Sequence, residues 1–155
     1  SPLGMCIKNG IIYGDYMTSY SVMAVKKDGT IYTPAQGLMG KNLLAAGVKD
    51  TYNFGPVLIK DGEAQLPWAE TEKYYPRTAV GMVKPNDYVL LVTDTGSYNG
   101  LNHWDMVDIF KSYGCTYAYN LDGGGSATLY FNGKVMNKLI GNTQRPCADF
   151  LYFTR

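Results

Sequence analysis

Short runs of apolar and β-branched residues recur along the chain, and small polar or glycine-containing segments separate them. Four of these separators are the dipeptides Asn9-Gly10, Asp28-Gly29, Asp61-Gly62 and Asn132-Gly133. A two-residue hairpin turn requires positive φ at both central residues, and Asn-Gly and Asp-Gly adopt it readily. The pattern therefore predicts four hairpins or tight strand turns, and the fourteen tyrosines of the chain add to its β-propensity.

Two further runs predict strands at the centre of a sheet. Residues 88–93 (YVLLVT) form a continuous apolar run, which is typical of a strand buried on both faces. Residues 116–121 (TYAYNL) form the second strand. Each run ends in a segment rich in glycine and aspartate, so a functional site could follow either strand.

The segment between these strands carries the clearest helix signal. Asn102 can cap its N-terminus, Asp105 places a negative charge near that end, and Gly114 stops the helix. The apolar residues at helical spacing are Met106, Val107, Phe110 and Tyr113. Strand, helix and strand in this order predict a right-handed crossover with parallel strands. With a weaker, shorter helix over residues 40–50, these elements predict a single α+β domain with a mixed β-sheet, several hairpins and a few helices.

Composition excludes several other classes of protein. Apolar residues make up 46% of the 155 residues and charged residues 17%, which is unlike a disordered chain. The net charge is +1 and no basic patch dominates, so we expect no nucleic-acid partner. No apolar run approaches the ~20 residues that span a bilayer, and no signal peptide is visible. The sequence leaves the oligomeric state open.

Cysteine and histidine supply no metal or redox motif. Cys6, Cys115 and Cys147 lie far apart without a Cys-x-x-Cys pair, so at most one disulfide is expected. Each cysteine is most simply a small buried hydrophobe. His103 is the only histidine, and its place early in the predicted helix favours a structural role. No Rossmann fingerprint or P-loop is present, and we expect no cofactor and no required metal.

Two carboxylates follow the two central strand patterns. Asp94 comes after residues 88–93, and Asp122 comes after residues 116–121. If those strands are parallel neighbours, both side chains emerge at the sheet edge where open α/β sheets bind ligands. Asp122 and Asp94 are therefore candidate catalytic residues, although Asp-Gly is also a plain turn and the segment after Asp94 could be an exposed loop.

The three glycines after Asp122 predict an anion site. Successive main-chain N–H groups of this kind form a concave nest, and the hydroxyl of Ser126 follows directly. The glycines concerned are Gly123, Gly124 and Gly125. The plain alternative is a bulge, which a triple glycine also marks.

Two arginines fit an anion site as well. Arg77 and Arg145 each neighbour a proline near a strand pattern. A planar guanidinium is the best side chain for bidentate phosphate binding, although a solvated charge at a strand edge is the commoner case.

In these segments the sequence resembles the phosphodiester glycosidase family. The resemblance rests on PRTAVG (76–81), the strand ending at Asp94, GLNHWDMVDIFKSYG (100–114), NLDGGGSATLYFNGKVMN (120–137) and RPCADFLYF (145–153). FGPVLIKDG (54–62) is similar to bacterial members connected with exopolysaccharide metabolism. The residues after Asp94 depart from the family pattern. Bacterial members often read Asp-Gly-Arg where this chain has Asp94-Thr95-Gly96. The family pattern also has an upstream strand, so the resemblance implies that residues 1–155 lack an N-terminal segment of the family domain.

The resemblance implies a hydrolase that cleaves a sugar-1-phosphodiester at the glycosidic bond and releases the sugar and a phosphomonoester. It implies a sugar phosphodiester or phosphorylated glycan as partner, at an extracellular or cell-surface location. Asp122 and Asp94 would supply the chemistry. The substrate-binding residues would be Arg77, Arg145, Asn120, Gly123, Gly124, Gly125 and Ser126. A non-catalytic binding module for anionic glycans, or an inactive fragment of the enzyme, remain the alternatives.

Overall fold

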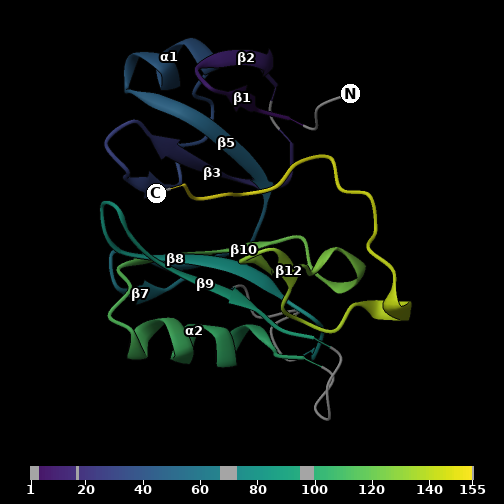
Figure 1. Ribbon diagram of the computed structural model, residues 1–155. Helices are drawn as coiled ribbons and strands as arrows, with labels where there is room; N and C mark the ends of the chain where they lie inside the picture. The colour runs from purple at the N-terminus through teal and green to yellow at the C-terminus, as the bar shows by residue number, and fades with distance from the viewer. Residues whose placement is uncertain (1–3, 17, 67–72, 95–99, 155) are drawn as a thin grey trace.

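The computed structural model describes residues 4–16, 18–66, 73–94 and 100–154 (Figure 1). A five-stranded sheet has the order β7-β6-β10-β8-β9 and consists of β6 (Val57–Lys60), β7 (Glu63–Ala64), β8 (Thr78–Lys84), β9 (Asp87–Val92) and β10 (Tyr117–Leu121). A three-stranded sheet has the order β4-β3-β5 and consists of β3 (Ser21–Lys26), β4 (Ile31–Tyr32) and β5 (Val48–Phe54). The remaining strands form two hairpins, β1 (Cys6–Lys8) with β2 (Ile11–Gly14) and β11 (Tyr130–Phe131) with β12 (Lys134–Val135). The α-helices are α1 (Gly40–Ala45) and α2 (His103–Ser112), and two 3-10 helices span Gly124–Ser126 and Ile140–Asn142.

These elements are arranged in layers (Figure 1). Helix α2 covers one face of the five-stranded sheet, and the three-stranded sheet lies against the other face. The β1–β2 hairpin and α1 pack on the far side of the three-stranded sheet. Each interface buries its own apolar cluster, so the fold has three stacked cores.

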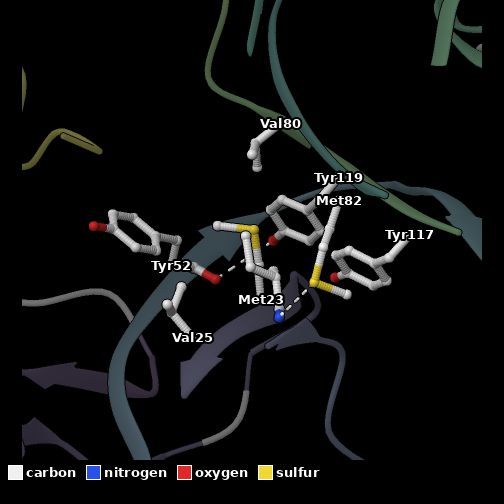
Figure 2. Packing of buried hydrophobic residues seen from close by; sticks show 8 residues of the cluster. Met23, Val25, Tyr52, Val80, Met82, Tyr117 and Tyr119 are labelled. Carbon is white, nitrogen blue, oxygen red and sulfur yellow. Dashed lines mark hydrogen bonds between the residues drawn. The ribbon is translucent and has the colours of Figure 1, made fainter. Parts of the chain in front are cut away.

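Buried tyrosines join the two larger sheets. Figure 2 shows this cluster, whose labelled members are Met23, Val25, Tyr52, Val80, Met82, Tyr117 and Tyr119. The Tyr119 hydroxyl donates to the Ser21 carbonyl at 2.6 Å and accepts from the Phe54 amide at 2.7 Å. The Tyr117 hydroxyl shares a hydrogen bond of 2.6 Å with the Thr33 hydroxyl. Because each buried hydroxyl is satisfied, the interface gains apolar area without leaving an unpaired polar group.

The four predicted hairpin turns are confirmed. They connect β1 to β2, β3 to β4, β6 to β7 and β11 to β12. Three have positive φ at both central residues, for example 50° at Asn9 and 76° at Gly10. The β3–β4 turn differs, because there only Gly29 has positive φ and Asp28 accepts a hydrogen bond from the Thr30 amide at 2.9 Å.

Helix α2 is confirmed together with its cap. The Asn102 side chain accepts from the Asp105 amide at 2.8 Å, and the Asp105 carboxylate accepts from the Asn102 amide at 3.2 Å. Met106, Val107 and Phe110 are buried against the sheet. Tyr113 was expected on the same face but is exposed, because the helix ends one residue earlier. The weaker helix, predicted over residues 40–50, ends at Ala45, since β5 already begins at Val48.

The α+β class is confirmed, but the arrangement of the two central strands differs from the prediction. β9 and β10 run in the same direction, yet β8 lies between them and pairs antiparallel with both. Every strand pair in the described residues is therefore antiparallel, so a mixed sheet was wrong in this detail. β9 is an edge strand in which Leu90 is exposed and no residue is fully buried, whereas a fully buried central strand was expected. The cause is a tight turn at Pro85-Asn86, with φ of 65° at Asn86, which folds β9 back onto β8.

The cysteines in the described residues are free thiols. Cys115 is buried in the cluster under α2, and burial raises the pKa of its thiol. Cys147 is exposed, so the interpretation as a buried hydrophobe is wrong there. No helix in the described part of the chain is both long and apolar enough to cross a bilayer.

Candidate functional site

The candidate carboxylates lie at one end of the five-stranded sheet. β9 ends at Val92 and β10 ends at Leu121, and because the two strands run the same way, Asp94 and Asp122 leave the sheet at the same end. The intervening β8 separates these strands by roughly 10 Å, twice the usual strand spacing. The N-terminus of α2 returns to this end, since Asp105 of its first turn and Asp94 line one hollow.

Asp122 is part of a compact polar cluster with Ser126 and Arg145. The Arg145 guanidinium lies 2.7 Å from the Asp122 carboxylate and also donates to the Ser126 hydroxyl. The Ser126 hydroxyl donates to the same Asp122 oxygen at 2.7 Å. About half of each charged side chain, 51% for Asp122 and 53% for Arg145, is exposed. The cluster is therefore ordered by its own contacts and open to a ligand.

The glycines after Asp122 meet a steric demand from a neighbouring segment. A Cβ at Gly123 would lie 2.4 Å from the Pro76 carbonyl oxygen and 3.4 Å from the Arg77 Cα, so only glycine fits. The Gly124 amide donates to that Pro76 oxygen at 2.8 Å, and Gly124 has a φ of 55°. The Gly124 N–H, one of the three expected in the anion nest, is thus engaged within the protein.

Gly125 and Ser126 complete the 3-10 turn beside the cluster. The Ser126 amide donates to the Gly123 carbonyl at 2.9 Å, which closes the turn. A Cβ at Gly125 would lie 3.7 Å from the Arg145 side chain, an ordinary van der Waals contact. The turn therefore carries the Ser126 hydroxyl toward Asp122 and packs Gly125 against Arg145.

Arg77 lies beside the glycine segment, but its guanidinium is directed elsewhere. Its Nε donates to the Leu101 carbonyl at 3.1 Å, and its Nη2 donates to the Lys73 carbonyl at 2.9 Å. The guanidinium also lies 5.2 Å from the centroid of the Tyr75 ring. In the main chain, the Arg77 amide donates to the Thr93 hydroxyl at 2.9 Å. The structure thus brings the Arg77 backbone to Gly123 and uses its side chain to tie together the segments around the site.

Asp94 borders a hollow of about 770 Å³ at the end of β9. Its carboxylate accepts a hydrogen bond of 3.0 Å from the main-chain amide of Lys138. The other residues that line the hollow are Tyr74, Val92, Thr93, Gly100, Leu101, Asp105, Asp108, Ile109, Met136 and Asn137. Asp122 and Arg145 are not among them, so the two candidate carboxylates border different parts of this end of the sheet.

Asn120 is buried and has a clear structural role. Its Nδ2 donates to the Gly55 carbonyl at 2.8 Å, and its main chain bonds to Gly55 and Pro56. Its Oδ1 has no hydrogen-bond partner among the described residues. The side chain thus anchors the connection from β5 to β6, two residues before Asp122.

Two contacts at the site were missed from the sequence. Lys138 contacts Asp94 through its main-chain amide, which no side-chain pattern can indicate. Asn137 lies in a motif of the family resemblance, but its partners across the β11–β12 hairpin depend on the fold. In the described part of the chain, no group of three or more His, Cys, Asp or Glu side chains is arranged to hold a metal ion.

Comparisons with known proteins point to one family. The family model for phosphodiester glycosidases matches residues 1–154. The SPbeta prophage-derived uncharacterized protein YomE of Bacillus subtilis (strain 168) is 31% identical over 160 residues, covering 96% of this chain and 25% of that protein. The mouse N-acetylglucosamine-1-phosphodiester alpha-N-acetylglucosaminidase is 28% identical over 156 residues, covering 84% of this chain and 29% of that protein.

A solved structure shares the fold. It is the catalytic domain of the zebrafish N-acetylglucosamine-1-phosphodiester alpha-N-acetylglucosaminidase, auto-inhibited by its pro-peptide, with a TM-score of 0.73 and 24% sequence identity. The match covers 90% of this chain and 51% of the zebrafish chain. The match thus spans 25% and 29% of these two curated relatives and 51% of this structural neighbour.

Proposed function

The chain belongs to the phosphodiester glycosidase family, and we propose that it hydrolyses a sugar-1-phosphodiester at the glycosidic bond. Water adds to the anomeric carbon, the bond from that carbon to the phosphate oxygen breaks, and a phosphomonoester leaves. The observation that carries this proposal is the cluster of Asp122, Ser126 and Arg145 at the end of the sheet. It places a cation that can bind phosphate beside a carboxylate that can stabilise positive charge.

The chemistry requires little acid catalysis. A phosphate monoester has a second pKa of about 6, so it leaves far more easily than a sugar alkoxide. The harder task is to stabilise the cationic, oxocarbenium-like anomeric centre and to deliver water or a nucleophile. Asp122 is the residue for this task, and Asp94 is the second carboxylate.

Arg145 binds the phosphate of the substrate. In the free protein its guanidinium pairs with Asp122, and both side chains are half exposed. A phosphodiester can take over part of this pairing, because a guanidinium binds two anionic oxygens at once. The Asp122 carboxylate is then left beside the departing phosphate, with Ser126 as its remaining hydrogen-bond donor. The amides of Gly123 and Gly125 extend this anion site, and Arg77 supports it by binding the Leu101 and Lys73 carbonyls beside the glycine segment.

The relatives support a sugar phosphodiester as the substrate class. The mouse, bovine and human proteins that match are all named N-acetylglucosamine-1-phosphodiester alpha-N-acetylglucosaminidase. We propose a phosphorylated glycan outside the cell or at its surface as the natural partner of this chain. An exopolysaccharide would fit this location.

The catalytic unit extends, in this proposal, beyond the 155 residues. The chain spans 51% of the zebrafish catalytic domain. Several large apolar side chains of its C-terminal part are exposed, namely Tyr130, Phe131, Met136, Ile140, Phe150, Tyr152 and Phe153. Exposed apolar side chains of this kind are typical of a surface that another part of a protein covers.

Turnover of an N-acetylglucosamine-1-phosphodiester tests the proposal. We expect Asp122→Asn to lower kcat by about a thousandfold, because the amide cannot stabilise a cationic centre. Asp61→Asn is the matched control. It lies in the turn at the opposite end of β10, where Gly62 donates to Thr116, and asparagine accepts the positive φ of that turn. Unchanged turnover in Asp122→Asn would remove Asp122 from the chemistry.

The same assay separates the alternatives. The pairing of Arg145 with Asp122 also suits a module that binds anionic glycans without cleaving them. Binding of the phosphodiester by calorimetry without any product would favour that module. Turnover that requires a longer protein with additional N-terminal residues would identify the 155 residues as an incomplete catalytic unit.

A further inference from the structure

We propose that Asn137 and Lys138 act as a latch that fixes the Asp94 carboxylate relative to Asp122, and that Asn137 is a positioning residue of the site. The inference rests on the proposed function, because it assigns these residues to the same pair of carboxylates. It also makes a structural claim that can be measured without turnover.

The Asn137 side chain closes the base of the β11–β12 hairpin. Its Oδ1 accepts from the Leu129 amide at 2.7 Å, and its Nδ2 donates to the Ala127 carbonyl at 2.9 Å. A third hydrogen bond, from the Met136 amide to the Leu129 carbonyl at 2.8 Å, lies next to them. These hydrogen bonds thus join the segment before β11 to the segment after β12, at the base of the hairpin.

The latch connects the two carboxylates over a short path. Ala127 is buried and directly follows Ser126, whose hydroxyl donates to Asp122. On the other side of Asn137, the amide of Lys138 donates to Asp94 at 3.0 Å. Hydrogen bonds and adjacent peptide units therefore lead without a gap from Asp122 to Asp94.

The hairpin itself has little else to hold it. β11 and β12 are two residues each, and their four residues are exposed. A two-stranded hairpin of this kind is marginal in water on its own. The fixed position of Lys138 therefore depends on the side chain of Asn137 rather than on packing of the strands.

The latch matters because the separation of two catalytic carboxylates decides how water or a nucleophile fits between them. Asp94 lies beyond the end of β9, which is an edge strand among the residues that the structure describes. The main-chain N–H of Lys138 donates to its carboxylate there and so contributes to its orientation. Loss of this donor is expected to affect the reaction step more than the binding of substrate.

The first test uses two variants of one residue. Lys138→Pro removes the amide hydrogen, and Lys138→Ala keeps it while removing the side chain. We expect Lys138→Pro to lower kcat about tenfold with KM nearly unchanged, and Lys138→Ala to retain both. A second pair of variants changes Asn137. Asn137→Ala is expected to resemble Lys138→Pro, and Asn137→Asp is expected to lose activity as well, because its second carboxylate oxygen would face the Ala127 carbonyl instead of donating to it. Equal kinetics of Lys138→Pro and Lys138→Ala, or of Asn137→Ala and the unaltered protein, would overturn the latch.

The second test needs no activity. In nuclear magnetic resonance spectra of the unaltered protein, the Lys138 amide proton is expected to shift as Asp94 takes up a proton on acidification. Asp105 and Asp108 border the same hollow, so Asp94→Asn is the control, and it should abolish the shift. A Lys138 amide signal that does not shift with pH, or that still shifts in Asp94→Asn, would contradict the hydrogen bond from Lys138 to Asp94. Absence of turnover in the unaltered protein would count against the proposed function alone, because this measurement still tests the contact between Lys138 and Asp94 on which the latch depends.

Discussion

At the scale of single residues, the placement of Asp122 depends on the residue that follows it. Gly123 lets the chain pass against the Pro76 carbonyl, and the Gly124 amide then bonds to that carbonyl. The carboxylate is thereby held beside Ser126 and Arg145. The glycines after Asp122, which have no Cβ, thus allow close contact between this segment and the segment at Pro76.

Gly123→Ala is therefore expected to destabilise the protein. The new Cβ would overlap the Pro76 oxygen, and forced movement of packed backbone costs about 1–3 kcal/mol in the free energy of unfolding. Gly125→Ala is the matched control, because its Cβ would only contact the Arg145 side chain at 3.7 Å. Urea denaturation of both variants measures the difference. Similar unfolding free energies for the two would show that the close approach at Gly123 is not needed.

At the scale of elements, α2 brings its N-terminus to the same end of the sheet as Asp94 and Asp122. Its first turn depends on the reciprocal hydrogen bonds between Asn102 and Asp105. These bonds satisfy amides that a helix start otherwise leaves without partners. The cap therefore links a local sequence signal to the position of the hollow beside Asp94.

Replacing the cap is expected to cost stability in a graded way. Asn102→Ala should lower the free energy of unfolding by about 1 kcal/mol, whereas Asn102→Ser, which retains a capping oxygen, should lose little. Thermal or urea unfolding measures both. A loss of the same size in Asn102→Ser would point to a role of the asparagine amide other than capping.

The elements also show where sequence-based prediction succeeds and where it fails. The hairpins and α2 were predictable, because a turn dipeptide and a cap with periodic apolar residues are local signals. The position of β9 was not, since an apolar run does not reveal which strands lie beside it. Apolar residues on both faces of β9 are partly buried, Tyr88 against the three-stranded sheet and Val89 in the cluster under α2. This edge strand therefore has the continuous apolar run that is typical of a central strand.

At the site, too, some residues were predictable from the sequence, whereas the partners of others depend on the fold. Asp122, Ser126 and Arg145 were named from the sequence and come together, although Arg145 lies 23 positions after Asp122. The side chain of Arg77 and the buried Asn120 instead bind main-chain carbonyls. Their partners come from distant segments, which residue type alone cannot specify.

At the scale of the whole molecule, the C-terminal segment ties the layers to the site. Lys8 of β1 pairs with Asp149 at 3.0 Å, and the ring of Phe153 lies 5.1 Å from that of Tyr88. The segment therefore contacts both the β1–β2 layer and the five-stranded sheet (Figure 1). Because Arg145 lies on the same segment, the position of the guanidinium that we propose to bind phosphate depends on the packing of these layers.

The buried tyrosines predict how this packing responds to pH. Burial raises the pKa of Tyr52, Tyr117 and Tyr119 above the ordinary tyrosine value. Their hydroxyls stay neutral in the folded protein at a pH where the unfolded chain ionises, so stability present below about pH 10 is lost as the pH rises further. Tyrosinate absorbance and circular dichroism should show that the last tyrosines ionise only as the fold is lost. Complete ionisation of all fourteen tyrosines in a folded protein would contradict the buried interface.

Hydrolysis in water enriched in heavy oxygen tests the central claim most directly. If Asp122 and Arg145 act on the sugar side of a phosphodiester, the solvent oxygen must attach to the anomeric carbon. Mass spectrometry of the products should then find the label in the released sugar and none in the phosphomonoester. Label in the phosphate group would mean that the bond between phosphorus and oxygen is cleaved, and the protein would then be a phosphodiesterase acting at phosphorus.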